Sequence, residues 1–266
     1  MSALPLTLGL SAGALLVHER RARRNAERLA AGLLETLLNA IDATDAQTGA
    51  HVRRVARYAL ILAEAADLDH HARTSVERVA LFHDIGKISE ALFDIIHDER
   101  LLTPEERHAI ATHPARGARV LAPLEAFYPD LADGVLAHHE CWDGTGYPRR
   151  LAGEAIPYAA RIVSIADTFD AVTATRRYRS GKGALVGAET VSRGRGTQFD
   201  PVLADLFLCP PVFECVLQTQ QELTVEHPRR AERRAGRVDP AADVKFRWRS
   251  ATPARLPQDP EIQTLP

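Results

Sequence analysis

The chain has 266 residues, of which 45% are hydrophobic and 26% are charged, a balance typical of a globular protein with one sizeable domain and appendages. The formal net charge of −2 provides no overall basic field, so we expect no DNA or RNA polymer as a partner. Its 3 cysteines include no CxxC pair, which argues against a disulfide framework and fits a reducing compartment.

The N-terminal segment 1–18 is apolar, with no charged residue between positions 2 and 17, and HERRARR follows at 18–24. The apolar run is shorter than the roughly 20 residues that a membrane-spanning helix needs. Its positive charges come after it, which is not the order of a secretory signal. Two interpretations stay open: a marginal membrane anchor with the following chain in the cytoplasm, or a packed N-terminal helix.

Residues 19–40 have the pattern of a helical stalk or linker, and leucines recur at helical spacing toward its end. This helix fits either a homodimer contact with a second copy or the first helix of the core. From 41 to 222 helical patterns follow one another without alternating β patterns, so we predict an all-α domain. In the segment 48–66, Val55 and Leu62 share an apolar face, and Arg54 lies mostly off it.

Local signals predict where several helices of this domain begin and end. Thr103 precedes Pro-Glu-Glu, which is a helix start, and Pro157 is expected to open the next long helix. Glycines and arginines weaken any helix over 181–196, and FDPVLADLF at 199–207 resumes one. The Arg- and Pro-rich segment 223–266 has no period, and we expect a mostly disordered tail.

A set of histidines and aspartates on otherwise apolar helix faces stands out as a candidate metal site. The set is too large for a single tetrahedral zinc and suits two divalent ions. Its mixture of imidazole and carboxylate ligands favours iron or manganese as readily as zinc. The members are His51, His83, Asp84, His113, His138, His139 and Asp167.

Two metal ions a few ångströms apart are the usual apparatus for hydrolysing phosphoesters. Lys87 lies about one helical turn beyond His83, where it could contact a phosphate or protonate a leaving oxygen. The competing interpretation of Lys87 is a surface lysine that ends a helix. The histidine and aspartate set together with this lysine therefore points to a phosphohydrolase.

Two motifs, HDIGK at 83–87 and HHECWDGTGYP at 138–148, resemble those of the HD-GYP group of HD-domain metal phosphohydrolases. Four further segments follow in the expected order, and the resemblance covers about residues 35–210. The resemblance implies an HD-domain-type helical bundle. It also implies a cytoplasmic phosphodiesterase for the bacterial messenger cyclic di-GMP. The expected product is pGpG, and further hydrolysis to GMP stays open.

The resemblance also implies roles for individual residues. A hydroxide between two metals, iron or manganese, would attack the phosphorus, with the histidine and aspartate set above as ligands and Asp84 bridging the ions. Asp84 and Lys87 would be catalytic, and Lys87 would lie at the edge between metal and phosphate. Substrate contacts would come from Lys87, from the pocket lip formed by Gly146, Tyr147 and Pro148, and from two basic side chains, Arg176 and Arg179.

Some positions depart from the family pattern. Gln47 stands where some members carry a glutamate for a third metal, and a neutral amide is a poor metal ligand, so we predict two ions. The segment 88–102 differs from the family in sequence and length and borders the pocket there. Two alternatives therefore stay open: a phosphohydrolase for another cyclic dinucleotide or nucleotide, and a non-catalytic module that binds cyclic di-GMP.

Overall fold

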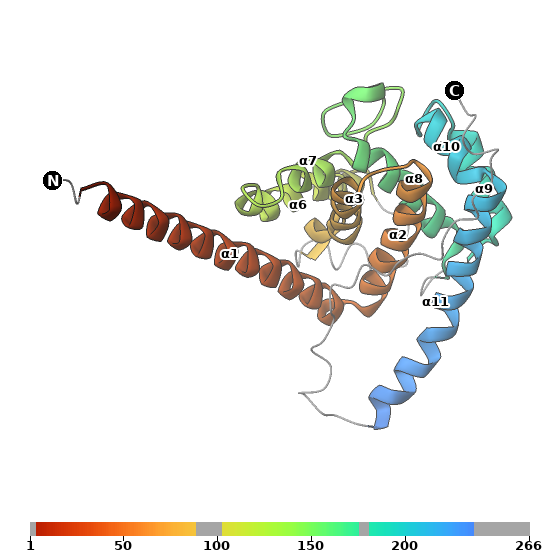
Figure 1. The fold of residues 1–266 in the computed structure, drawn as a ribbon. Helices are drawn as coiled ribbons and strands as arrows, with labels where there is room; N and C mark the ends of the chain where they lie inside the picture. The colour runs from red at the N-terminus through yellow and green to blue at the C-terminus, as the bar shows by residue number, and fades with distance from the viewer. Residues whose placement is uncertain (1–3, 89–102, 176–180, 237–266) are drawn as a thin grey trace.

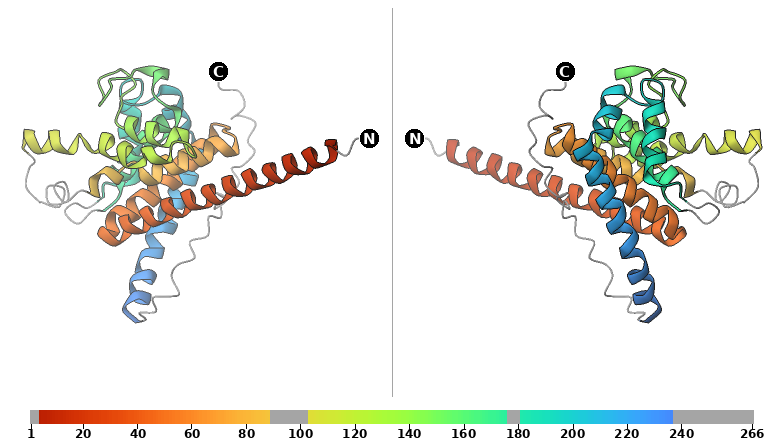
Figure 2. Two further views of the ribbon diagram at one scale, coloured as in Figure 1. Left: turned by 90° about the vertical axis from the view of Figure 1, so that its left-hand side faces the viewer. Right: turned by 90° about the vertical axis from the view of Figure 1, so that its right-hand side faces the viewer.

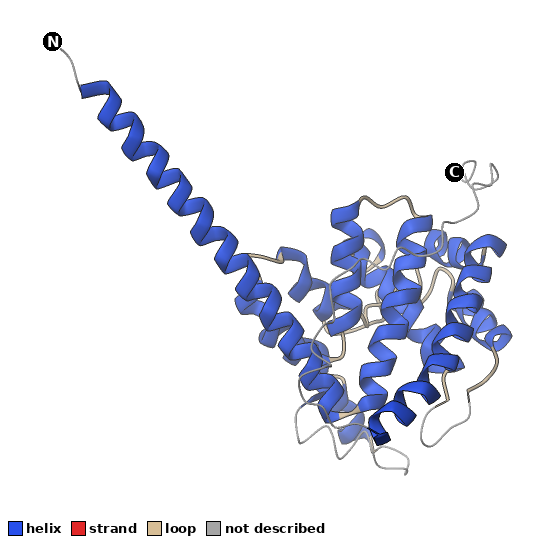
Figure 3. Ribbon diagram, turned by 60° about the horizontal axis from the view of Figure 1, so that its bottom comes forward, coloured by secondary structure: helices blue, strands red, loops and turns tan. Residues whose placement is uncertain are grey.

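The computed structural model describes residues 4–88, 103–175 and 181–236. Over these residues the fold is helical and no β-strand is assigned, which confirms the predicted all-α class (Figure 3). The α-helices are α1 (Leu4–Thr44), α2 (Ala46–Ala65), α3 (His70–Phe82), α5 (Pro104–Ile110), α6 (His113–Leu121), α7 (Pro129–Ala137), α8 (Tyr158–Thr173), α9 (Ala184–Gly194), α10 (Pro201–Leu208) and α11 (Pro210–Gly236). Short 3-10 helices are η1 (Ile85–Ile88), η2 (Ala122–Leu124) and η3 (Gly153–Ala155).

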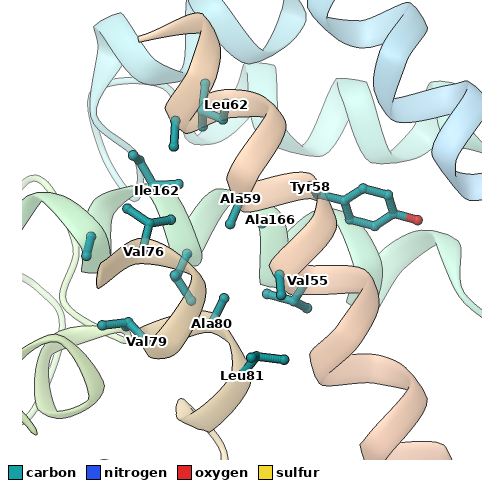
Figure 4. Packing of buried hydrophobic residues seen from close by; sticks show 14 of the residues in the cluster. Val55, Tyr58, Ala59, Leu62, Val76, Val79, Ala80, Leu81, Ile162 and Ala166 are labelled. Atoms are coloured by element: carbon teal, nitrogen blue, oxygen red, sulfur yellow. The ribbon is translucent and has the colours of Figure 1, made fainter. Parts of the chain in front are cut away.

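Helix α2 lies at the centre of the domain, in contact with α3, α8 and α11 (Figure 1). Its apolar side chains meet those of α3 and α8 in a continuous core. Figure 4 shows Leu62 of α2 near Ile162 of α8 and Val76 of α3, with Val55 further along α2, and all four are buried. This packing holds together the three helices that carry much of the candidate site.

Phe169 joins α8 to the C-terminal helices. Its ring centroid lies 5.4 Å from that of Tyr58 on α2 and 5.4 Å from that of Phe207 on α10, both in edge-on contact. The ring of Phe213 on α11 lies 5.9 Å away. Edge-to-face pairs of this kind add stability beyond the apolar area that they bury. The aromatic cluster thus fixes α8 against α2, α10 and α11.

The predicted helix starts at Thr103 and Pro157 are confirmed, and side-chain caps stabilise several helices. Thr103 and Glu106 form a capping box at the start of α5, and Pro157 immediately precedes α8. The Asp45 side chain accepts hydrogen bonds from the backbone at the start of α2, and Asp200 does the same for α10. Each cap satisfies backbone N–H groups that have no partner within their own helix.

The prediction that residues 181–196 disfavour a helix was wrong, because α9 spans Ala184–Gly194. Gly187 lies where α9 packs against α8. A Cβ atom at Gly187 would lie 2.6 Å from Thr173 Cγ2 and 2.8 Å from the ring of Phe169. The glycine lowers helix propensity, but it allows the close contact with α8 that stabilises the helix.

The two long terminal helices extend away from the body in different directions (Figure 2). The C-terminal part of α1 packs on the core through Leu34, Leu38 and Ile41, whereas Leu29 and Leu33 are 68% and 47% exposed. The exposed pair lies on the helix for which a homodimer contact was predicted, and that contact stays a prediction.

At the other end α11 runs to Gly236, so residues 223–236 are helical where the sequence predicted a tail. Alanine, glutamate and arginine in this stretch favour a helix.

The described residues contain no single helix that is both long and apolar enough to cross a membrane. On length and composition alone, α10 and the part of α11 up to Leu223 pass such a test together, as a pair bent by 68°. The rest of the predicted tail, 237–266, lies outside the described residues.

The close packing of α9 on α8 can be tested by substitution. We expect Gly187→Ala to destabilise the fold by about 1–3 kcal/mol, because the new methyl group overpacks against Phe169. Gly32→Ala on α1, where a Cβ has open space, should not destabilise and should gain roughly 0.5–1 kcal/mol from lower chain entropy. Urea denaturation of both variants measures the difference, and equal stabilities would contradict the packing explanation.

Candidate metal centre

The structure brings the predicted metal ligands together in two neighbouring groups. In each group the possible ligand atoms all lie within 4.8 Å of one another: His51, His83 and Asp167 in the first group, and His113, His138 and His139 in the second. Asp84 reaches both groups. Its Oδ2 lies 3.6 Å from His83 Nε2, and its Oδ1 lies 3.3 Å from His113 Nε2. The carboxylate of Asp84 is therefore placed between two sites, as the predicted bridging role requires.

These side chains come from five helices and their ends. His51 lies in α2 and Asp167 in α8, while His83 and His138 are the residues that cap the C-terminal ends of α3 and α7. His113 is the first residue of α6. A close approach of η1 to α6 joins the two halves, since a Cβ at Gly86 would lie 2.0 Å from the carbonyl oxygen of His113. Glycine at this position lets Asp84 come within reach of the second group.

Three of the imidazoles are held in the same way by a nearby backbone carbonyl oxygen. Each Nδ1 makes a hydrogen bond to the carbonyl oxygen three residues earlier: His83 to Ala80 at 2.8 Å, His113 to Ile110 at 2.7 Å and His138 to Val135 at 2.6 Å. A carbonyl oxygen only accepts, so Nδ1 carries the proton in each ring. In the neutral ring Nε2 then has a free lone pair directed into the cluster, which is the form that binds a metal.

The resulting arrangement of nitrogen lone pairs fits a cation. His113 Nε2 and His138 Nε2 face each other at 3.1 Å, and His83 Nε2 is buried without a hydrogen-bond partner. Two lone pairs at this distance repel, and a buried acceptor without a donor is costly. A divalent ion beside these nitrogens would remove both penalties. The residues present therefore fit the metal ions that the sequence predicts.

Burial and neighbouring charges set the protonation of the cluster. Burial lowers the pKa of His138 well below its usual value and lowers that of His139 to about 3, with the neighbouring imidazoles acting in the same direction. Burial would raise the pKa of Asp84, but Lys87 and His83 outweigh it and hold that pKa well below the usual range. Neutral imidazoles and an ionised carboxylate are the states that ligate metals.

His51 differs from the other histidines. Burial would lower its pKa, but hydrogen bonds to Asp167 and Asp170 raise that pKa to about 9. Its Nε2 lies 3.2 Å from Asp167 Oδ1, and its Nδ1 lies 2.7 Å from Asp170 Oδ2. His51 is therefore held between two carboxylates and would release a proton on binding a metal ion.

The predicted substrate contacts lie at the edge of this cluster. Lys87 Nζ lies 2.7 Å from Asp84 Oδ1, and its side chain is 28% exposed. The ring of Tyr147 lies 5.0 Å from that of His139, and its backbone N–H donates to the His139 carbonyl at 3.2 Å. Gly146 is buried in the tight loop that carries Tyr147, and Pro148 is exposed at its rim. The segment that contains Arg176 and Arg179 lies outside the described residues.

Sequence reasoning missed three buried or half-buried charged residues around the cluster. Asp170 and Arg54 form an ion pair behind His51, with Arg54 Nε 2.6 Å from Asp170 Oδ1. Glu140 accepts backbone hydrogen bonds from Arg149 at 2.7 Å and from Leu151 at 3.0 Å, which fastens the loop that follows His139. One signal was available, because Arg54 and Asp170 each lie three residues after a predicted ligand on the same helix face.

Comparison with known proteins identifies the family. A family model described as HD domain matches residues 35–203, and the chain therefore belongs to the HD-domain family. The 3′3′-cGAMP-specific phosphodiesterase 2 of Vibrio cholerae is 36% identical over 178 residues, covering 66% of this chain and 34% of that protein. A cyclic di-GMP phosphodiesterase of the same organism is 34% identical over 186 residues, covering 63% of this chain and 37% of that protein.

The chain thus spans about a third of the length of these two curated relatives. Among solved structures, a cyclic GMP-AMP-specific phosphodiesterase from V. cholerae superposes with a TM-score of 0.51 at 21% identity. The superposition covers 72% of this chain and 52% of that one. This likeness shows a shared fold, and the motifs quoted above resemble those of the HD-GYP group within the HD-domain family.

The fit of the cluster to metal ions predicts a stability effect. Mn²⁺ at 100 times its dissociation constant should stabilise the folded protein by about 2.7 kcal/mol, because the ligands are assembled only in the folded state. Thermal unfolding followed by circular dichroism, with and without Mn²⁺, measures the shift. His83→Ala should reduce it, whereas His70→Ala, which removes an exposed imidazole from the same helix α3, should not. An equal shift in both variants would contradict the assignment.

Proposed function

We propose that this domain is a metal-dependent phosphodiesterase that hydrolyses cyclic di-GMP to pGpG, with further cleavage to GMP left open. The observation that carries the proposal is the position of Asp84 between two groups of candidate ligands. One ion would be held by His51, His83 and Asp167, and the other by His113, His138 and His139, with Asp84 shared. When bound, two such ions supply an activated water and neutralise charge on the phosphate.

Lys87 is the general acid or phosphate contact in this proposal. Its Nζ lies against the Asp84 carboxylate and its side chain is partly open to solvent, so it can reach a phosphate at the same edge. A lysine at this position can donate a proton to the leaving 3′ oxygen or hold a phosphate oxygen of the substrate. The ion pair with Asp84 keeps the Lys87 ammonium group near the place where the phosphodiester would react.

Tyr147 provides the surface for a base. Burial raises the pKa of its hydroxyl to about 12, with the Asp84 and Asp167 charges acting in the same direction, so the phenol stays neutral. Its backbone is fixed on His139, and the ring is only partly buried. An aromatic ring held in this way can stack on a purine, an interaction that tolerates different bases. Gly146 and Pro148 shape the rim beside it.

A second substrate, 3′3′-cGAMP, is supported by the comparisons. The relative specific for 3′3′-cGAMP is 36% identical, and the cyclic di-GMP phosphodiesterase is 34% identical, so identity favours neither. Stacking on Tyr147 also does not discriminate guanine from adenine. The residues 89–102, where the sequence departs from the family pattern, lie outside the described part of the chain.

We further propose iron or manganese as the metal and the cytoplasm as the place of action. The cluster combines imidazoles with carboxylates and contains no thiolate, a donor set that suits iron and manganese as well as zinc. A cyclic dinucleotide messenger is made inside the cell, which puts its hydrolysis on the cytoplasmic side.

The function can be tested by product analysis with protein purified without oxygen. We expect cyclic di-GMP to be hydrolysed in the presence of Mn²⁺ or Fe²⁺, and a panel that adds 3′3′-cGAMP and cyclic di-AMP ranks the substrates. His83→Ala combined with Asp84→Ala should lower kcat/KM at least about 10³-fold, since ligands of both ions are lost. His70→Ala should retain full activity.

Two results would contradict this proposal. Turnover that persists without His83 and Asp84 would show that the cluster is not the reaction centre. Tight binding of a cyclic dinucleotide without turnover in any metal would instead identify a non-catalytic module, the alternative from another functional class.

A further inference from the structure

We infer that Asp170 and Arg54 are positioning residues, which together fix the ring of His51 in the orientation that its metal site needs. This inference rests on the proposed metal centre and adds to it a pair of residues that do not touch the metal. The two residues lie on α8 and α2, the helices that carry Asp167 and His51.

The contacts form a chain of charge-assisted hydrogen bonds. His51 Nδ1 lies 2.7 Å from Asp170 Oδ2. Arg54 donates from Nε to Asp170 Oδ1 at 2.6 Å and from Nη2 to Oδ2 at 2.9 Å. The Asp170 side chain is 1% exposed, and that of Arg54 is 19% exposed. A carboxylate buried this deeply is stable only with such partners, so the burial of Asp170 depends on its hydrogen bonds to Arg54 and His51.

His51 needs a side-chain partner because of its place in the fold. His83, His113 and His138 lie at helix ends and donate to carbonyl oxygens of their own segment. His51 lies inside α2, where backbone carbonyl oxygens already accept hydrogen bonds of the helix. Its Nδ1 therefore bonds to the side chain of Asp170, which is 119 positions away in the sequence.

The hydrogen bond to Asp170 decides which nitrogen of His51 faces the cluster. With Nδ1–H donated to the carboxylate, Nε2 points toward Asp167 Oδ1 at 3.2 Å and Asp84 Oδ2 at 3.8 Å. The same bond ties α2 to α8, so it also sets the spacing between His51 and Asp167. A partner of this kind on a ligating histidine is generally worth about 10–100-fold in metal affinity.

Mn²⁺ titration of the metal-free protein, followed by the electron paramagnetic resonance signal of free Mn²⁺, tests the inference without measuring activity. Asp170→Asn should weaken one Mn²⁺ site about 10–100-fold. The site formed by His113, His138 and His139 should keep its affinity, because His113 and His138 are held by backbone carbonyls. This loss at one site of two is a result that general destabilisation does not produce.

The matched control is Asp200→Asn. Asp200 is 5% exposed and pairs with Arg161 at 2.8 Å, so its substitution breaks a buried arginine–aspartate pair away from the ligands. We expect this variant to lose stability in thermal unfolding and to keep both Mn²⁺ affinities. Asp170→Asn binding two Mn²⁺ ions with wild-type affinities would overturn the inference.

If Asp170→Asn does not fold, Arg54→Gln tests the same inference. Arg54 is partly exposed, and Asp170 keeps its hydrogen bond to His51 in this variant, so we expect it to fold. Weaker binding at one site supports the inference, and unchanged affinity at both sites overturns it. The proposed function fails separately, if the wild-type protein binds two Mn²⁺ ions but cleaves no cyclic dinucleotide. In that case the comparison of Mn²⁺ affinities still decides the roles of Asp170 and Arg54.

Discussion

The concentration of imidazoles and carboxylates inside a helical bundle is the constraint on which the rest of this structure depends. Four of the histidines and two aspartates of the site region are among the most buried polar residues of the domain: His51, His83, His113, His138, Asp84 and Asp170. Burying such groups is costly unless each finds a partner. Backbone carbonyls and the Arg54–Asp170 pair satisfy the outer side of the cluster. Its inner side presents lone pairs and carboxylate oxygens, which is the environment of a divalent cation.

The helical fold assembles this cluster by bringing the ends of several helices together. His83 and His138 end their helices, and His113 begins one, so each imidazole can use a nearby carbonyl oxygen without breaking a long helix. Gly86 lets η1 approach α6 closely enough for Asp84 to span both groups. The apolar contacts of α2 with α3 and α8 fix the end of α3 that carries His83 relative to His51 and Asp167. Packing of apolar side chains thus determines the distances between polar ones.

The proposed function assigns the chemistry and the choice of substrate to different parts of the domain. Under the proposed function, the cluster and Lys87 would act on the phosphodiester, whereas the base would meet the loop around Tyr147. Glu140 fixes this loop by accepting hydrogen bonds from the backbone of Arg149 and Leu151. Relatives named for two different cyclic dinucleotides have similar sequence identity to the chain. Variation in the segments around a constant cluster would account for such a division.

The sequence by itself determined the helical class, the helix starts at Thr103 and Pro157, and the residue types of the candidate site. These features depend on local periodicity, on caps and on motifs whose spacing is visible in the chain. Only the tertiary structure decided that Asp84 lies between two groups of ligands, that Asp170 and Arg54 support His51, and that α9 forms despite its glycines. Each of these depends on contacts between distant segments, such as the 119 positions that separate His51 from Asp170. Local patterns place Arg54 and Asp170 on the ligand-bearing faces of their helices, but they do not specify which buried partner a side chain meets.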